Sequence, residues 1–172
     1  FINDAFGTCH RAHASTEGVT HYLPAVCGFL VQKEIEYFQK VLTQPQKPFL
    51  FILGGAKVSD KIPVIENMME KADHIIIGGA MAYTFMKSQG IDIGSSRVEP
   101  DMEETVKMIL EKARERDLTI SLPKDHVVTD NLETAERVQT TDGETIEQGW
   151  MGVDIGPLTI DRKTGMRMTH IP

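Results

Sequence analysis

The chain has 172 residues, of which 41% are hydrophobic and 25% are charged, a balance typical of one soluble globular domain. No apolar run reaches the roughly 18–20 residues of a membrane-spanning helix, and the first residues lack the basic stretch of a signal peptide. The net charge of -7 argues against a broad nucleic-acid-binding surface, although it is compatible with a local basic pocket. Cys9 and Cys27 lack C-x-x-C spacing and are interpreted as reduced thiols of a cytoplasmic protein.

The N-terminal segment combines a short apolar stretch with a cluster of possible cations. Residues 1–6 are typical of the end of a strand, and because Phe1 stands where an initiator Met is expected, we expect the chain to be truncated there. His10, Arg11 and His13 follow, and a guanidinium beside imidazoles favours an anion pocket. A structural histidine pair is an alternative. A metal site is a weaker one, because the histidines lack carboxylate or thiolate partners.

A helix is predicted after this segment. Apolar side chains recur at helical spacing, at Val31, Ile35, Phe38 and Leu42. Further apolar residues widen the stripe, which predicts packing on two sides of the helix. Pro45 ends the pattern, because proline lacks a backbone donor and clashes with the preceding turn.

Strands and helices alternate in the remainder of the chain. The strands are predicted at residues 49–53, 74–77 and 118–122, and the helices at 81–89, at 102–116 and from Ser59 or Asp60 onward. This alternation is typical of a parallel sheet joined by crossover helices. The predicted fold class is therefore α/β, a Rossmann-like parallel sheet with helices on both faces, incomplete in this chain.

A glycine-rich turn with two lysines joins the first of these strands to its helix. Gly55 and Ala56 allow the backbone to approach phosphate oxygens, and the first N–H groups of the helix are expected to point outward. Lys57 and Lys61 are four residues apart and can reach one anion. The segment is not a Walker A loop. The alternative is a tight turn with solvated lysines.

A second turn at Gly78 and Gly79 is expected to lie beside the first, because parallel strands end at the same edge of the sheet. Two such turns could hold a flat base between them, or could simply be tight. Gly152 and Val153 belong to a third glycine-rich turn after Trp150, for which an ordinary loop is the simpler explanation.

These segments together resemble phosphoglycerate kinase. The similar segments occur in the family's order, at residues 3–8, 10–13, 54–61, 77–85 and 149–152. The resemblance extends to about Ile160 and covers less than half of a full-length member. It implies four parts: 1–26 as the end of an N-terminal substrate-binding domain, 27–44 as an interdomain helix, 45–160 as part of a C-terminal nucleotide-binding domain, and 161–172 as a divergent tail.

The resemblance implies roles for individual residues. Lys57 is expected to follow the transferred phosphoryl group, Lys61 to hold nucleotide phosphates, and Arg11 to contact 3-phosphoglycerate, with Lys57 and Arg11 as the catalytic pair. His10 and His13 complete the substrate-binding patch. The residues implied to line the adenine-nucleotide pocket are Gly55, Ala56, Gly78, Gly79, Gly152 and Val153. The chain departs from the family at Ala80, where a third glycine is usual, and at Arg97, where an apolar residue often flanks the adenine.

The activity implied is reversible phosphoryl transfer between 1,3-bisphosphoglycerate with ADP and 3-phosphoglycerate with ATP, in glycolysis. The fragment alone is expected to be inactive. Mg²⁺ is expected to bind through ATP or ADP, without a protein ligand in this chain. Full-length members are expected to be monomeric, with no nucleic-acid or membrane partner. The alternative from another class is a non-catalytic adenine-nucleotide-binding α/β module.

Overall fold

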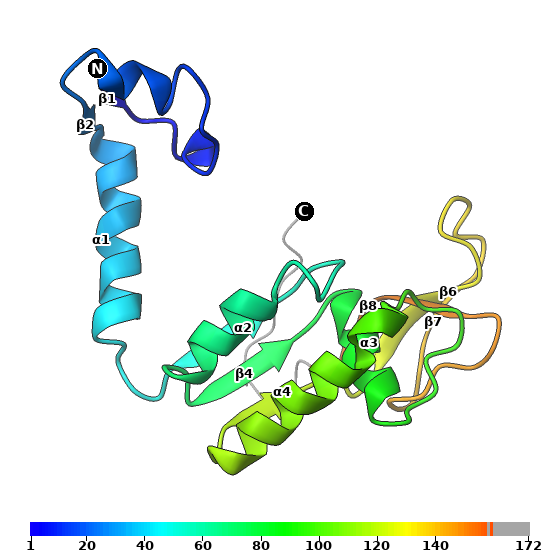
Figure 1. The fold of residues 1–172 in the computed structure, drawn as a ribbon. Helices are drawn as coiled ribbons and strands as arrows, with labels where there is room; N and C mark the ends of the chain where they lie inside the picture. Colours follow the sequence, from blue (N-terminus) through cyan, green and yellow to red (C-terminus); the bar gives the residue numbers. More distant parts are fainter. Residues whose placement is uncertain (158, 160–172) are drawn as a thin grey trace. The chain divides into compact units, whose positions relative to one another are not determined.

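The computed structural model describes residues 1–157 and 159, so the expected divergent tail at 161–172 lies outside the described residues. The chain divides into two compact units, Phe1–Lys47 and Pro48–Pro172, and each is described by itself. Figure 1 shows their elements in chain order. Within the described part, no helix is both long enough and apolar enough to cross a membrane.

The N-terminal unit begins with a parallel pair of very short strands. Its elements are β1 (Ile2–Asn3), the 3-10 helices η1 (Phe6–Thr8) and η2 (Gly18–His21), β2 (Val26–Cys27) and α1 (Phe29–Thr43). Helix α1 is capped from a distance: the carboxylate oxygen Oδ1 of Asp4 accepts hydrogen bonds from the N–H groups of Leu30 (2.7 Å) and Val31 (3.0 Å). A Cβ on the N-cap residue Gly28 would overlap this carboxylate, so the position needs glycine.

The predicted helix is confirmed, while its predicted packing on two sides stays a prediction, because only contacts within this unit are described. Val31 is the buried residue of α1, whereas Phe29, Tyr37 and several other apolar side chains are more than a third exposed. Phe38 stacks on Phe6 with ring centroids 6.1 Å apart. Helical spacing therefore predicted the element correctly, while the neighbours of its apolar stripe could not be read from the pattern.

The C-terminal unit contains the predicted parallel sheet, in the order β3-β4-β5. The strands and the elements between them are β3 (Leu50–Leu53), α2 (Ile62–Met69), β4 (His74–Ile77), α3 (Met81–Ser88), η3 (Pro100–Met102), α4 (Glu103–Glu115) and β5 (Thr119–Ser121). Each crossover adds a strand in the same direction, and right-handed crossovers of this kind put their helices on one face. Ile75 and Ile77 of β4 accordingly pack with all three helices in one core.

The α/β class and the parallel sheet are thus confirmed, with helices α2–α4 on one face. On the other face Leu50 and Ile52 are 38% and 45% exposed, so the described residues of this unit do not provide the expected second helical layer there. The sheet order gives the reason, because a second layer requires crossovers that run in the opposite direction along the sheet.

A second sheet, antiparallel, was not predicted. Its order is β7-β6-β8, with bounds β6 (His126–Thr129), β7 (Val138–Thr140) and β8 (Met151–Ile155). The interpretation of Gly152 and Val153 as parts of a turn is therefore wrong, because both lie in β8 and pair with β6. Helix α3 is buried from Met81 to Met86, because it packs into both the first core and a second core beneath this sheet.

Candidate functional site

The two glycine turns pack against each other at the carboxyl ends of β3 and β4, as predicted. The N–H of Gly78 donates to the carbonyl of Leu53 (2.8 Å), and that of Met81 donates to the carbonyl of Gly55 (2.9 Å). Gly79 has φ +66°, and a Cβ on it would lie 2.8 Å from both N and O of Gly55. The backbones therefore approach too closely for any side chain at residue 79, and the edge presents bare peptide groups.

Lys57 and Lys61 lie on the loop that follows the first turn. Lys57 is exposed and Lys61 is half-buried. The Cε atom of Lys61 lies 3.6 Å from the position that a Cβ on Gly55 would take, so its side chain runs alongside the first glycine turn. Among the described residues, no hydrogen bond or ion pair engages either ammonium group. Both cations are therefore available to an anion.

The backbone amides of this loop are used differently from the prediction. The N–H groups of Val58 and Ser59 donate to the Glu99 carboxylate (2.5 and 3.2 Å), and those of Lys61 and Ile62 donate to the Val58 carbonyl (2.8 and 3.1 Å). The expectation that the first helical amides point outward to a phosphate is wrong for these four groups. Helix α2 also begins later than predicted, at Ile62. Recognition of an anion here would rely on the lysine side chains.

Strand β8 reaches the second glycine turn. A methyl carbon of Ile155, Cγ2, lies 3.9 Å from the position of a Cβ on Gly78. Gly152 donates its N–H to Ser96 Oγ (2.9 Å), and a Cβ on it would overlap the buried Tyr83 ring. Val153 is 44% exposed. The structure therefore places Gly55, Ala56, Lys57, Lys61, Gly78 and Gly79 on adjoining turns, with Gly152 and Val153 on a strand whose end contacts them.

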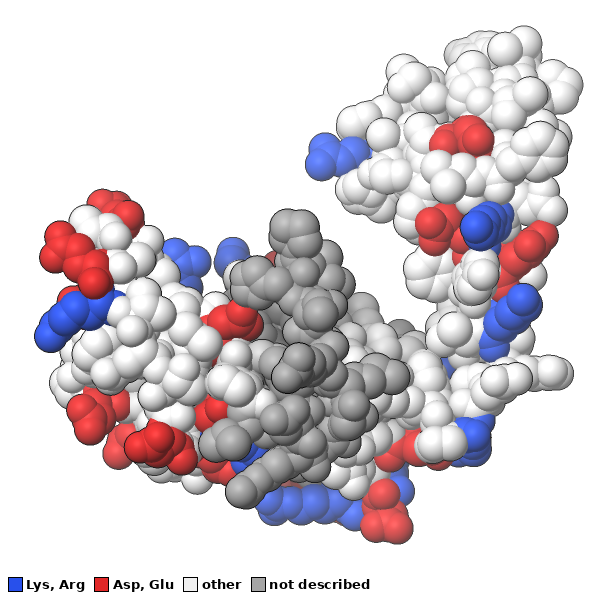
Figure 2. All heavy atoms as spheres, turned by 180° about the vertical axis from the view of Figure 1, so that it is seen from behind, with Lys and Arg blue, Asp and Glu red and all other residues white. Residues whose placement is uncertain are grey.

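His10, Arg11 and His13 lie together in the N-terminal unit and are exposed. Arg11 Nε donates to His10 Nε2 (3.2 Å), while the hydroxyl of Thr16 bonds to the Arg11 carbonyl (2.6 Å) and to the His13 N–H (3.0 Å). Arg11 is the sole lysine or arginine of residues 1–28, and Figure 2 shows little blue on this part of the surface. The pocket would therefore depend on one guanidinium and its neighbouring imidazoles.

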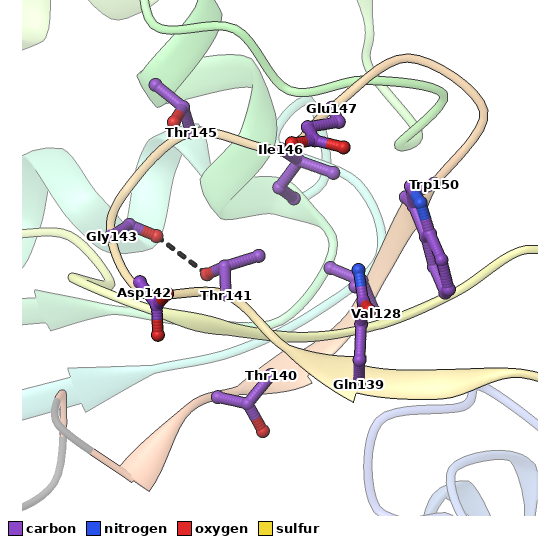
Figure 3. Close-up of a pocket in the computed structure, with 10 residues that line it drawn as sticks. All are labelled: Val128, Gln139, Thr140, Thr141, Asp142, Gly143, Thr145, Ile146, Glu147 and Trp150. Atoms are coloured by element: carbon purple, nitrogen blue, oxygen red, sulfur yellow. Dashed lines mark hydrogen bonds between the residues drawn. The ribbon is translucent and has the colours of Figure 1, made fainter.

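A separate hollow of about 490 Å³ lies between the 139–147 segment and Trp150 (Figure 3). Val128 and Ile146 line it together with polar and acidic groups that include Asp142 and Glu147. None of the described residues that line this hollow is a lysine or an arginine. Because phosphate recognition needs cations or free amide donors, this hollow suits a nucleotide's phosphates less well than the glycine turns do.

The two glycine turns, the lysine pair and strand β8 lie within a segment that matches a known sequence family. The sequence model of the phosphoglycerate kinase family matches residues 1–166. The chain belongs to the phosphoglycerate kinase family. The match continues past Ile160, into the segment that was expected to diverge.

Individual phosphoglycerate kinases show the same extent of similarity. The curated protein of Clostridium perfringens is 56% identical over 160 residues, and that of Thermosipho africanus is 52% identical over 161. The structure of the enzyme from Coxiella burnetii superposes with a TM-score of 0.78 at 39% identity, covering 92% of this chain and 41% of that one. The chain spans about 40% of the length of the curated phosphoglycerate kinases that it matches.

Sequence reasoning missed two acidic residues that organise these regions. Glu99 binds the loop amides next to the lysines, and Asp4 caps α1. The bonded partners are 41 and 26 positions apart in the chain, so no local spacing could reveal them. One feature of the sequence pointed to a distant cap for α1. The N-cap residue Gly28 has no side chain, so the first N–H groups of the helix needed an acceptor from elsewhere.

A buried histidine links Tyr83 to the antiparallel sheet. His126 is fully buried, and its Nε2 lies 3.1 Å from the Glu144 carbonyl, which can only accept a hydrogen bond. The neutral ring therefore carries its hydrogen on Nε2, and Nδ1 faces the Tyr83 hydroxyl at 3.5 Å. Burial lowers the pKa of His126, opposed by the Glu144 carbonyl and by the charges of Asp125 and Glu144.

This burial predicts a loss of stability in mild acid. Below the ordinary histidine pKa of about 6.5 the unfolded chain takes up a proton that folded His126 does not, so the free energy of unfolding should fall as pH drops, by up to about 1.4 kcal/mol per pH unit from this residue. Urea unfolding at pH 7.5 and 5.5 measures it. His126→Gln should reduce the pH dependence, whereas the exposed control His21→Gln should retain it. Equal dependence in both variants would rule out His126 as the cause.

Proposed function

We propose that this chain provides the nucleotide-binding edge, and part of the substrate-binding surface, of a phosphoglycerate kinase. The reaction is reversible phosphoryl transfer between 1,3-bisphosphoglycerate with ADP and 3-phosphoglycerate with ATP. The observation that carries the proposal is the position of Lys57 and Lys61, unpaired among the described residues, beside two bare glycine turns in a member of this family. The domain assignment is part of the proposal: 1–26 substrate-binding, 27–44 interdomain helix and 45–160 nucleotide-binding.

The geometry of the glycine turns suits an adenine nucleotide. Gly55, Ala56, Gly78 and Gly79 present peptide groups and at most a methyl, so a flat base could lie against the backbone. Gly152 and Val153 would add the surface of β8, where Val153 is exposed. Lys61, whose side chain runs alongside Gly55, would bind the phosphates of the same nucleotide. This division of tasks is typical of sites at the carboxyl edge of a parallel sheet.

Catalysis of phosphoryl transfer depends on positioning and on stabilising spread negative charge. Lys57 is exposed and therefore has the freedom to follow a phosphoryl group that moves between donor and acceptor. Arg11 would hold the carboxylate or phosphate of 3-phosphoglycerate through its planar guanidinium, with His10 and His13 as further donors. These roles are the ones that the resemblance of segments 10–13 and 54–61 to phosphoglycerate kinase implies.

Mg²⁺ would be bound through the nucleotide. The phosphate oxygens of ATP or ADP would be its ligands, since Mg²⁺ prefers oxygen ligands and is commonly bound through substrate phosphates. The ion would neutralise phosphate charge when bound. The proposal also includes a monomeric full-length protein, no nucleic-acid or membrane partner and the cytoplasm as location, as the resemblance to the family implies.

A non-catalytic nucleotide-binding module is the second candidate. It is favoured by one observation, that the chain spans about 40% of the length of the kinases it matches. An activity assay separates the two. A chimera in which this chain replaces the matching segment of the Clostridium perfringens enzyme should turn over, whereas the chain alone should not. A chimera that folds and binds ADP without activity would favour the binding module.

Nucleotide binding by the chain itself is tested with Lys61→Ala. Loss of a charge-assisted hydrogen bond to phosphate should raise the Kd for ADP roughly 10- to 100-fold, which corresponds to about 1.5–3 kcal/mol. Isothermal titration calorimetry measures it. The matched control is Lys107→Ala on the exposed face of α4, which should leave the Kd unchanged. An unchanged Kd in Lys61→Ala would contradict the assignment.

A further inference from the structure

Glu99 engages the loop between the two candidate lysines with three hydrogen bonds. Its carboxylate accepts from the N–H groups of Val58 (2.5 Å) and Ser59 (3.2 Å) and from the Ser59 hydroxyl (2.7 Å). Val58 and Ser59 lie directly after Lys57 and shortly before Lys61. One side chain from a distant part of the chain thus holds the backbone that separates the two cations.

Both ends of this connection are anchored in the core of the C-terminal unit. The N–H of Glu99 donates to the hydroxyl of Thr84 (3.1 Å), which is 1% exposed on helix α3. The Val58 side chain is fully buried and belongs to the first core. Since Glu99 and Val58 are each attached to buried groups, the carboxylate acts between two fixed points. An acceptor held in this way is a clamp and not a mobile surface group.

The carboxylate is ionised at neutral pH. The hydrogen bond from the Ser59 hydroxyl holds the pKa of Glu99 below its ordinary range, with further lowering from the two backbone N–H groups and the positive charge of Lys57, and partial burial opposes these effects. The negative charge of Glu99 also attracts the positive charge of Lys57, which has no ion-pair partner among the described residues.

We propose that Glu99 is a positioning residue, which clamps the Val58–Ser59 turn so that Lys57 and Lys61 present their ammonium groups to the same phosphate chain. The inference deepens the proposed nucleotide site and rests on it. Without the clamp, the N–H groups of Val58 and Ser59 would lose their acceptor and the turn would sample other conformations. The two lysines would then no longer be oriented toward the same phosphate chain. The competing role, a carboxylate that occupies the place of a phosphate and leaves when one binds, predicts the opposite effect on affinity.

The test uses Glu99→Gln and Ser59→Ala in the full chain, with Glu111→Gln on α4 as the matched control. Glu99→Gln keeps the size of the side chain but removes its charge, so a neutral amide oxygen, which is a weaker acceptor, replaces the carboxylate oxygen that binds the N–H groups of Val58 and Ser59. Amide hydrogen exchange at Val58 and Ser59 should become at least roughly 10-fold faster, with exchange in β4 unchanged, and the Kd for ADP should rise roughly 10-fold. Ser59→Ala should show a smaller effect in the same direction. Glu111→Gln should show none.

The possible outcomes separate this inference from the proposed function. Unchanged exchange at Val58 and Ser59 in Glu99→Gln, in a wild-type chain that binds ADP, would overturn the clamp and leave the nucleotide site standing. Tighter ADP binding in Glu99→Gln would also overturn the clamp, and would favour the competing role in which the Glu99 carboxylate occupies the place of a phosphate and leaves when one binds. If Glu99→Gln speeds exchange at Val58 and Ser59 but the wild-type chain does not bind ADP, the nucleotide site would instead be refuted. If Glu99→Gln fails to fold, Ser59→Ala decides by the same two measurements.

Discussion

Replacing Lys57 with alanine is expected to lower kcat of the chimeric phosphoglycerate kinase roughly 30- to 1,000-fold, or about 2–4 kcal/mol of transition-state stabilisation. The physical reason is that an exposed ammonium group beside the nucleotide phosphates can stay with the phosphoryl group during transfer. Binding of ADP in the ground state should change far less than it does in Lys61→Ala. A coupled assay for ATP formation, with kcat and KM determined separately, measures the effect.

The kcat against KM pattern of the two lysine variants is the informative comparison. Lys57→Ala should act mainly on kcat, and Lys61→Ala mainly on nucleotide affinity, because Lys61 lies alongside the first glycine turn whereas Lys57 is exposed. Lys107→Ala serves again as the control for loss of one surface charge. Normal kcat in Lys57→Ala would end its assignment as a catalytic residue.

Gly79→Ala is expected to reduce the free energy of unfolding of the chain by about 2–5 kcal/mol. Two costs add. The left-handed φ of +66° costs an L-residue about 1–2 kcal/mol, and a Cβ placed 2.8 Å from N and O of Gly55 forces the two backbones apart, which costs about 1–3 kcal/mol. Urea unfolding, followed by circular dichroism and the fluorescence of Trp150, measures the loss.

Gly90→Ala is the matched control. Gly90 also has a positive φ, of +80°, but a Cβ on it would meet nothing within 4 Å. Its expected cost is therefore the conformational part alone, about 1–2 kcal/mol. The difference between the two variants measures the close approach of the glycine turns. Equal losses would show that residue 79 can accept a side chain, and that the turns are not locked together as described.

The same contact connects stability with the proposed function. Any shift of the second turn away from Gly55 also moves the N-terminus of α3, because the Met81 N–H donates to the Gly55 carbonyl. We therefore expect Gly79→Ala to weaken ADP binding as well, whereas Gly90 lies beyond the other end of α3.

The sequence by itself determined the α/β alternation, the positions of helices α1–α4 and of the three strands of the parallel sheet, and the two glycine turns with their lysines. These features are local. An apolar strand such as Leu50–Leu53, a helical stripe such as Val106, Ile109 and Leu110, and the four-residue spacing of Lys57 and Lys61 can each be recognised from a few consecutive residues. The family resemblance rested on the same contiguous segments.

Only the tertiary structure decided what these features contact. In the folded chain the loop amides donate to Glu99, where the sequence had suggested that they are free. Asp4 caps α1, and the segment around Gly152 pairs as a strand of an antiparallel sheet. The physical reason is the same in each case. A hydrogen bond or a strand pairing between residues that lie far apart in the chain satisfies a backbone group without imposing any periodicity on either partner, so the pattern of residues along the chain does not record it.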